Sequence, residues 1–361
     1  MGRKEWSAVL EEPSKIVLKE FDIPEIGPEE GLLKVEMAGV CGTDPKAYHG
    51  KFAWIQPPLI LGHEVVGYIE EVGENASKRW GVRKGDRVVT EAGATCGRCY
   101  QCVSGRHRWC ENRLGFRIPC KRPPYLWGSY GEYQYLPPGA HVYKLSKDVS
   151  AEAAVLINAV VANGIQWVRI AGGASIGDVV VIQGMGAQGF AATMGAKESG
   201  ASPIIITGLT ADEPRFQLAK RFGADYTINV EKEDIVRRVR EITQGKMADV
   251  VVDVSGNPKA IAQSIDIVRI QGTVVCASVV GTDVLTPLAT DKLAMNEIRF
   301  QGVFTNGHEA MRAAIKLVES RKYPVEEIVT HKFPLQQAED AVKAAGGETL
   351  DVRPIKVVLV P

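Results

Sequence analysis

Four cysteines gathered in one short segment are the residues of this chain with the clearest chemistry. Cys96, Cys99, Cys102 and Cys110 are separated by two, two and seven residues. Cys-x-x-Cys segments supply thiolate ligands in pairs, and four thiolates form the closed tetrahedral cage of a structural zinc ion. The alternative is a pair of disulfides. Because residues 1–6 do not resemble the start of a signal peptide, we expect a reducing compartment and predict zinc.

A second, more open set of possible metal ligands lies upstream. Cys41 and His63 offer a thiolate and an imidazole to an open site, in which three protein ligands would leave one position on zinc for water or substrate. Taken singly, Cys41 would be a small buried apolar residue, His63 a core histidine and the neighbouring Glu64 a surface carboxylate. Because Cys41 and His63 occur together in a chain that also has a cofactor loop, we interpret them as ligands of a catalytic metal.

The cofactor loop is the segment Gly-Met-Gly-Ala-Gln-Gly at residues 184–189, which fits the pattern G-x-G-x-x-G. It follows an apolar run at residues 179–182 and precedes a helical pattern, which is the context that the motif requires. The first glycine permits a tight turn, the second lets the backbone approach a pyrophosphate, and the third allows close packing of helix and strand. The alternative is a glycine-rich turn without a ligand. The predicted contacts are Gly184, Gly186, Ala187, Gln188 and Gly189.

The position that reads the adenosine ribose is occupied by Gly208, nineteen residues after the last glycine of the loop. An acidic residue near this distance would hold the ribose 2′-OH of NAD. Glycine removes a carboxylate that would repel a 2′-phosphate, and Thr210 and Arg215 are candidate phosphate contacts. Asp212 and Glu213 would oppose a phosphate. The sequence therefore favours NADP slightly and leaves NAD open.

The elements that must position these residues fall into two kinds. Up to residue 150, short β-branched runs at 32–38, 65–72 and 86–90 alternate with Gly and Pro, which predicts a mostly antiparallel, barrel-like domain. A helix capped by Ser150 is expected over 151–161. Beyond it, buried strands alternate with helices, which predicts a parallel sheet covered on both faces. The expected strands are 179–182, 204–207, 250–253 and 273–276, and the expected helices are 189–199, 215–222 and 261–268.

A helix at 308–320 and a strand at 355–359 are expected to return the chain to the first domain. At 361 residues, the length favours two domains. We predict an α/β protein with a mostly-β domain at residues 1–157 and 303–361 and a nucleotide-binding domain at 158–302.

Composition excludes several classes of partner. Lys and Arg together number 43, as do Asp and Glu, so no net charge attracts nucleic acid or an anionic membrane. No apolar run approaches the ~20 residues that a membrane-spanning helix needs. We expect a cytoplasmic enzyme whose partner is a small molecule.

The segments Cys41-Gly42-Thr43-Asp44 and Gly62-His63-Glu64, together with the four cysteines and the glycine loop in this order, resemble the zinc-dependent medium-chain dehydrogenase/reductase family of alcohol and polyol dehydrogenases. The likeness covers nearly the whole chain. It implies a GroES-like mostly-β catalytic domain, a Rossmann domain with a doubly wound parallel sheet, two zinc ions per chain and a homodimer or homotetramer.

The resemblance also implies roles for individual residues. Cys41 and His63 would be catalytic zinc ligands, and Glu64 either a third ligand or a group that exchanges with solvent on the metal. Thr43 would hydrogen-bond the substrate hydroxyl and begin proton removal, and Asp44 would orient His63.

Two positions depart from the family pattern. Many members have a histidine that passes the proton to solvent where this chain has Lys46, and a lysine relays protons only if its pKa is lowered. His49 is the alternative relay, and Lys46 would then hold cofactor phosphate or have no catalytic role. The family usually supplies another zinc ligand where this chain has Ile157 and Asn158, neither of which is a good ligand.

The remaining cofactor contacts implied by the resemblance follow later strands. Val279, Val280 and Phe304 are expected near the nicotinamide, and Arg353 resembles an arginine that contacts pyrophosphate. A surface role for Arg353 is the alternative.

The implied function is NAD(P)-dependent oxidation of an alcohol to a ketone or aldehyde. A secondary alcohol is expected, and Trp54 and Trp127 favour a bulky or cyclic one over a small polyol. One alternative is a metal-free enone or quinone reductase on the same fold. The other is a nucleic-acid-binding zinc module, for which Arg98 and Arg106 provide local positive charge.

Overall fold

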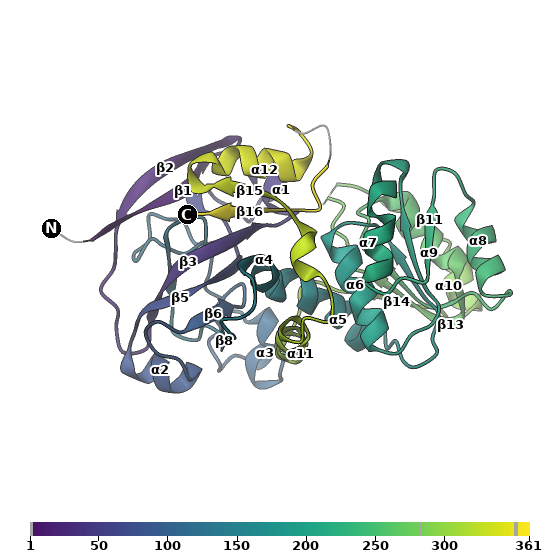
Figure 1. Ribbon diagram of the computed structural model, residues 1–361, viewed down its shortest axis with the longest axis horizontal. Coiled ribbons are helices and arrows are strands. Elements are labelled where there is room, and N and C mark those ends of the chain that lie inside the picture. Colours follow the sequence, from purple (N-terminus) through teal and green to yellow (C-terminus); the bar gives the residue numbers. More distant parts are fainter. Residues whose placement is uncertain (1–2, 282, 350–352) are drawn as a thin grey trace. The chain divides into compact units, whose positions relative to one another are not determined.

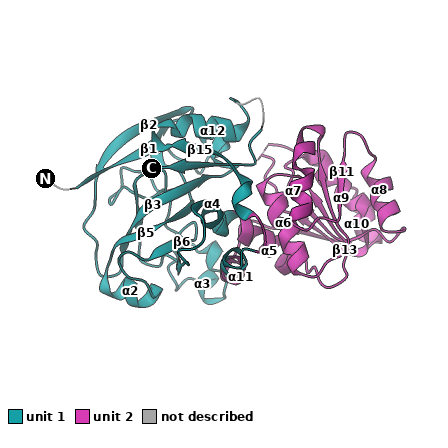
Figure 2. Ribbon diagram, viewed as in Figure 1, with its two compact units in different colours: residues 1–159, 315–321, 325–361 teal, residues 160–314, 322–324 magenta. Residues whose placement is uncertain are grey.

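The structure is a computed structural model that describes residues 3–281, 283–349 and 353–361. Figure 2 shows its two compact units. Unit 1 comprises Met1–Ala159, Ile315–Arg321 and Val325–Pro361, and unit 2 comprises Val160–Ala314 and Lys322–Pro324.

The sequence placed residues 303–314 in the first domain, whereas in the structure they cluster with unit 2. Two hydrogen bonds explain this difference. The Val303 N–H donates to the carbonyl of Cys276 at 3.1 Å, and the Asn306 side-chain amide donates to Asn163 Oδ1 at 2.8 Å.

Unit 1 is built on two sheets (Figure 1). One has the strand order β2-β1-β4, and the other has the order β15-β16-β3-β5-β6-β8, with β7 paired to β3. These pairings are antiparallel apart from the parallel pair β15–β16. The strands are β1 Lys4–Glu12, β2 Lys15–Asp22, β3 Gly31–Val40, β4 Leu59–Ile60, β5 Glu64–Val72, β6 Arg87–Thr90, β7 Tyr133–Leu136, β8 Val142–Lys144, β15 Val329–Pro334 and β16 Lys356–Val360.

The helices of unit 1 are short, and its core lies between the strands. Buried members of the core include Leu33 and Val35 on β3, Ile69 on β5 and Leu359 on β16. The helices are α1 Asp44–Tyr48, α2 Glu74–Trp80, α3 Tyr100–Val103, α4 Ala151–Val155 and α12 Ala338–Gly346. Helix α11 His308–Glu319 has residues in both units.

Unit 2 contains a six-stranded sheet in the order β11-β10-β9-β12-β13-β14, and all its pairings are parallel. Because the strands are parallel and in register, the loops after their carboxyl ends lie along one edge of the sheet, where this architecture binds ligands. The strands are β9 Val180–Gln183, β10 Ile204–Gly208, β11 Tyr226–Asn229, β12 Ala248–Asp253, β13 Val268–Cys276 and β14 Arg299–Gly302.

Figure 1 shows α6 and α7 on one side of these strands and α8, α9 and α10 on the other. Side-chain caps start two of the helices: Asp234 accepts from the Arg237 N–H before α8, and Asn257 accepts from the Lys259 N–H before α9. The doubly wound parallel sheet predicted from the sequence is confirmed. The helices are α5 Ala162–Ile165, α6 Ala187–Glu198, α7 Phe216–Arg221, α8 Ile235–Ile242, α9 Pro258–Ile267 and α10 Thr290–Met295.

The helix expected over residues 151–161 is interrupted. Ser150 caps α4 as predicted, since its Oγ accepts from the Ala153 N–H at 3.2 Å. The α-helix ends at Val155, and a π-helix follows over Ile157–Val161. This wider turn carries Asn158 toward the backbone of His63, which a regular helix pattern does not predict.

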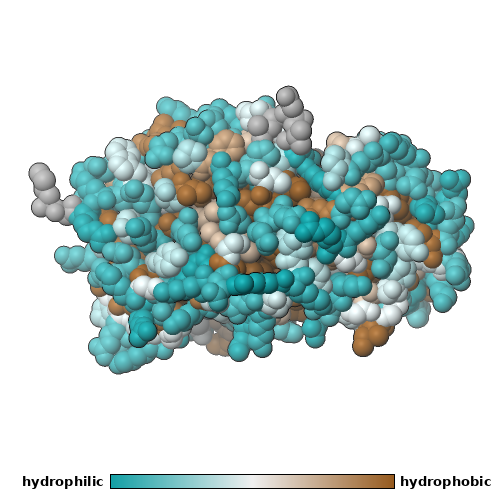
Figure 3. Space-filling view, viewed as in Figure 1, coloured by the Kyte–Doolittle hydropathy of each residue, from teal (hydrophilic) through white to brown (hydrophobic). Residues whose placement is uncertain are grey.

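The face seen in Figure 3 carries mainly hydrophilic residues, with hydrophobic ones in smaller patches. Among the described residues, no helix combines the length and apolar character needed to cross a membrane.

Candidate functional site

The four clustered cysteines converge in the structure as the sequence predicts. Their sulfur atoms all lie within 4.8 Å of one another, and the four thiols are free. Cys110 Sγ lies 3.5 Å from Cys96 Sγ and 3.9 Å from Cys99 Sγ. Four sulfurs at about 2.3 Å from one tetrahedral zinc ion would be about 3.8 Å apart, whereas disulfide sulfurs are about 2.0 Å apart. The spacing therefore fits a zinc cage.

The pKa values of these thiols also favour binding of a cation. Backbone N–H groups, first that of Arg98, and the amide of Asn112 lower the pKa of Cys96 to about 6. Desolvation and the neighbouring sulfur atoms raise the pKa of Cys102 to about 12. Four thiolates at this separation repel one another, so a divalent cation is what allows all of them to be deprotonated together.

The open set of ligands is positioned by strands β3 and β5. Gly39 on β3 pairs with Glu64 on β5, so Cys41, two residues further on, comes beside His63. The ligand atoms of Cys41, His63 and Glu64 lie within 4.8 Å of one another. Gly39 is required here, because a side chain at this position would collide with the Glu64 carboxylate.

Unsatisfied polar atoms show that this second set fits a metal ion. Across the described part of the chain, the buried atoms without a hydrogen bond include His63 Nδ1 and both carboxylate oxygens of Glu64. Burial alone would lower the pKa of His63, but the charges of Cys41, Asp44 and Glu64 outweigh it and raise that pKa to about 9. The surroundings of His63 thus favour positive charge, which zinc would supply.

Asp44 lies next to His63, but its hydrogen bonds are made to other residues. Its Oδ1 is 4.0 Å from His63 Nδ1, which is an electrostatic contact and too long for a hydrogen bond. Its Oδ2 accepts from the Cys41 N–H at 2.8 Å and from the Tyr130 hydroxyl at 2.7 Å. Burial raises the pKa of Asp44. Asp44 therefore fixes the loop that carries Cys41.

Lys356 and Asn158 border the open set. Lys356 on β16 is buried and forms an ion pair with the fully buried Glu64, although without hydrogen-bond geometry. The Asn158 side-chain amide donates to the carbonyl of His63 at 3.2 Å. Asn158 stands where the family pattern has a zinc ligand, and its amide nitrogen is hydrogen-bonded to the backbone.

The candidate proton-relay residues lie on or beside α1. Thr43 precedes this helix, and its hydroxyl makes no capping hydrogen bond. Desolvation, followed by the nearby charge of Lys51, lowers the pKa of Lys46. His49 Nε2 contacts Glu348 Oε1 at 2.7 Å. A lysine can relay protons only if its pKa is lowered, and the pKa of Lys46 is lowered.

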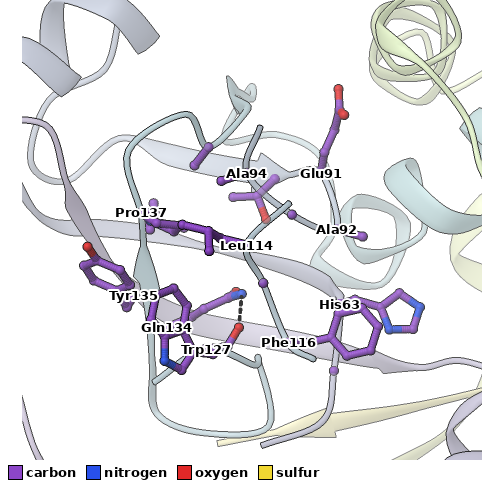
Figure 4. A pocket seen from close by; sticks show the side chains of 16 residues that line it. His63, Glu91, Ala92, Ala94, Leu114, Phe116, Trp127, Gln134, Tyr135 and Pro137 are labelled. Carbon is purple, nitrogen blue, oxygen red and sulfur yellow. Dashed lines mark hydrogen bonds between the residues drawn. The ribbon is translucent and has the colours of Figure 1, made fainter. Parts of the chain in front are cut away.

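A pocket in unit 1 reaches His63 (Figure 4). Phe116 stacks on the imidazole of His63 with ring centroids 4.6 Å apart. Trp127 and Gln134 lie at the other side of the pocket, and the Gln134 amide donates to the Trp127 carbonyl at 3.5 Å. Trp54 is not among the residues that line this pocket; it stacks on Phe52 and is 44% exposed.

The glycine loop of unit 2 has the geometry of a pyrophosphate cradle. Gly184 has φ +114°, and an added Cβ there would lie 3.0 Å from Ser255 Cα. Gly186 begins α6, and a Cβ there would meet no atom within 4 Å, which leaves space for a ligand. Ala187 and Gln188 form the first turn of α6, whose N–H groups can face an anion. Gly189 packs its Cα against the carbonyl of Gly184. These residues fit a dinucleotide.

The other predicted cofactor residues are spread over chain segments after strands. Gly208 ends β10, and Thr210 and Arg215 begin and end the 3₁₀-helix that follows it. Val279 and Val280 follow β13, and Phe304 follows β14. Arg353 is exposed shortly before β16 in unit 1.

Three residues of the site were not identified from the sequence. Lys356 stands at the start of an otherwise apolar strand, and a charge at that position was the available signal. Tyr130 and Phe116 lie in irregular segments, where no periodicity separates site residues from core residues.

Comparisons with known proteins agree with this geometry. Two family models match the chain: the alcohol dehydrogenase GroES-like domain over residues 27–147 and the zinc-binding dehydrogenase domain over residues 187–320. A probable alcohol dehydrogenase of Mycobacterium tuberculosis is 39% identical, covering 98% of this chain and 97% of that protein. An erythritol/L-threitol dehydrogenase of Mycolicibacterium smegmatis is 32% identical, covering 99% of this chain and 98% of that protein. A zinc-binding dehydrogenase of Sinorhizobium meliloti, solved bound to NADP, has a TM-score of 0.88 at 26% identity, covering 99% of this chain and 100% of the other.

Proposed function

Since this chain belongs to the zinc-dependent medium-chain dehydrogenase/reductase family, we propose that it oxidises a bulky or cyclic secondary alcohol to a ketone with NAD(P)+. The protein is a zinc-type alcohol dehydrogenase that uses a nicotinamide cofactor. The observation that carries the proposal for the site is the convergence of Cys41, His63 and Glu64 within 4.8 Å.

Cys41, His63 and Glu64 would hold the catalytic zinc, and the four clustered cysteines would hold a second, structural zinc. When bound, zinc supplies a Lewis acid for the substrate oxygen, and the nicotinamide accepts the hydride. Asp44 and Tyr130 keep the Cys41 loop in place, and Phe116 holds the His63 ring by stacking. Lys356 balances the charge of Glu64.

Thr43 is the proposed first acceptor of the substrate's hydroxyl proton. Its hydroxyl makes no capping bond to α1 and can turn toward a substrate. Lys46 is the proposed next group toward solvent, and its lowered pKa favours release of its proton. His49 is the weaker candidate because its ring contacts Glu348.

Aromatic side chains near His63 support a bulky or cyclic substrate. Phe116 stacks on His63 and Trp127 lies further along the same pocket, where the buried Gln134 Oε1 has no hydrogen-bond partner among the described residues. A substrate ring would pack against Phe116, while Gln134 would accept from a second polar group of the substrate. Turnover of cyclic, linear and polyhydroxylated alcohols would test this substrate class, and a preference for small polyols would contradict it.

A homodimer or homotetramer is the proposed assembly. Strand β14 is at the end of its sheet in the described chain, and Leu285 and Met295 in unit 2 are 89% and 83% exposed. An edge strand and exposed apolar side chains in the same unit support pairing with a second copy. Sedimentation velocity would give the mass of the assembly.

Metal analysis of a cysteine variant tests the catalytic site. We expect two zinc ions per wild-type chain, and Cys41→Ala should contain one zinc and lose turnover while its circular dichroism is unchanged. Cys120→Ala is the matched control, because this buried thiol is outside both ligand sets and should leave metal content and turnover intact. Turnover retained by Cys41→Ala would refute the proposed site.

A further inference from the structure

The carboxylate of Asp212 occupies the space that a side chain at Gly208 would enter. An added Cβ on Gly208 would lie 3.0 Å from Asp212 Cβ and 3.3 Å from Asp212 Oδ2. The same Cβ would lie 3.3 Å from Met185 Cβ in the glycine loop. A carboxylate is therefore present at the carboxyl end of β10, although residue 208 itself has no side chain.

The turn after β10 holds Asp212 in this place. Asp212 Oδ2 accepts from the Leu209 N–H at 3.0 Å, and Asp212 Oδ1 accepts from Arg215 at 3.0 Å. The same Arg215 nitrogen donates to the Met185 carbonyl at 3.2 Å, which ties the turn to the glycine loop. The Asp212 side chain is 18% exposed, so its carboxylate is held by these bonds and still reaches solvent.

Thr210 and Arg215, the residues predicted from the sequence to contact a 2′-phosphate, already have hydrogen-bond or ion-pair partners. Arg215 is ion-paired with Asp212. The Thr210 N–H donates to Glu231 Oε2 at 2.7 Å, and the Thr210 hydroxyl accepts from the Asn229 amide at 3.2 Å.

The charge around this turn is unfavourable for a phosphate. Glu213 accepts from Asn229 at 2.7 Å and pairs with Lys232 at 2.6 Å, so it lies in the same cluster as Glu231 and Asp212. The three carboxylates face two cations, Arg215 and Lys232, and each cation is already paired. A phosphate dianion placed here would add to an excess of negative charge.

We propose that Asp212 replaces the carboxylate missing at position 208, accepts a hydrogen bond from the adenosine ribose 2′-OH, and makes NAD(H) the preferred cofactor over NADP(H). This inference rests on the proposed function, because it needs a dinucleotide at the glycine loop. It runs against the slight preference for NADP that Gly208 alone suggests.

Direct binding of the two reduced dinucleotides tests the inference without a catalytic assay. The dissociation constants of NADH and NADPH would be measured by nucleotide fluorescence and calorimetry for the zinc-loaded chain. We expect the wild type to bind NADH at least about tenfold more tightly than NADPH. Asp212→Asn should reduce this preference about tenfold, because it weakens the ribose contact and releases Arg215 from its ion pair.

Asp225→Asn is the matched control. Asp225 Oδ2 accepts from the Ile204 N–H at 2.8 Å, so it makes the same kind of contact at the opposite end of β10. This variant should leave the preference unchanged.

The possible results separate the two proposals. An equal or greater affinity of the wild type for NADPH would overturn the role of Asp212 and leave the proposed function standing. This measurement does not depend on the folding of any variant. An unchanged preference in a folded Asp212→Asn chain would also overturn that role. Binding of neither dinucleotide would overturn the proposed function and this inference together.

Discussion

Glu5 is a buried carboxyl group on β1, far in sequence from both ligand sets. Its side chain has no exposed surface and accepts from the Ser7 hydroxyl at 2.7 Å and from the backbone N–H groups of Glu132 and Tyr133 at 3.2 and 3.3 Å. Burial raises the pKa of Glu5 to about 7 in spite of these bonds. A single residue therefore gives unit 1 a pH dependence near neutrality.

The sign of this dependence follows from proton binding. Because the pKa of Glu5 is higher in the folded chain than its ordinary value of 4.5, the folded state binds the proton more tightly. The free energy of unfolding should therefore fall as pH rises from 4.5 toward 7, by up to about 3 kcal/mol. Urea unfolding of wild type and Glu5→Gln across this range measures the effect. Parallel pH profiles for the two proteins would show that Glu5 does not titrate in this window.

At the residue scale, the sequence identifies ligands better than it identifies their partners. The four clustered cysteines were predicted because zinc chemistry restricts the residue types and their spacing, and Cys41 and His63 were predicted from the motifs shared with the dehydrogenase family. Asp212 was noted only as an unfavourable charge, since its approach to Gly208 depends on the 3₁₀-helix Thr210–Arg215. The spacing of residues in the sequence does not predict the contacts that such a turn makes.

At the scale of elements, strand β16 links the last part of the chain to the candidate catalytic site. It pairs with β3, which pairs with β5, and Lys356 at its start forms the ion pair with Glu64. Both side chains are buried, so removing one leaves the charge of the other uncompensated.

We expect Lys356→Met to destabilise the metal-free chain by about 3–5 kcal/mol. Bound zinc should recover part of this loss, because the ion would compensate Glu64. The double variant Lys356→Met/Glu64→Gln should regain stability without zinc, since no buried charge is left alone. Urea unfolding of the three proteins, each with chelator and with zinc, gives these values. If Lys356→Met were as stable as the wild type in the presence of chelator, this result would argue against a buried ion pair.

Strands were predictable where both faces are buried. The runs that became β9, β10 and β12 are continuous and apolar, and their residues are almost fully buried. Strands such as β14, with exposed or half-buried residues, lack this pattern and were not predicted. The π-helix at Ile157–Val161 was also missed, because its sequence is apolar apart from Asn158 and continues the pattern of a regular helix.

At the scale of the whole molecule, the two units have separate cores. The core of unit 1 lies among its antiparallel strands, and that of unit 2 lies on the parallel sheet, with Val181, Ile205 and Val251 at its centre. The residues of the two proposed zinc sites belong to unit 1. Metal binding should therefore act on the stability of one unit.

Chelation should reveal this division by hydrogen exchange. The segment of the four cysteines contains α3, which has no buried residue, so its backbone order depends on the metal and not on an apolar core. After zinc removal, amides of residues 96–110 should exchange at nearly unprotected rates, while those of β9, β10 and β12 keep their protection. Cys96→Ser should show the same local loss without chelator. Equal loss of protection in the parallel sheet would mean that the metal supports both cores, and the assignment of the four cysteines to a local structural site would be wrong.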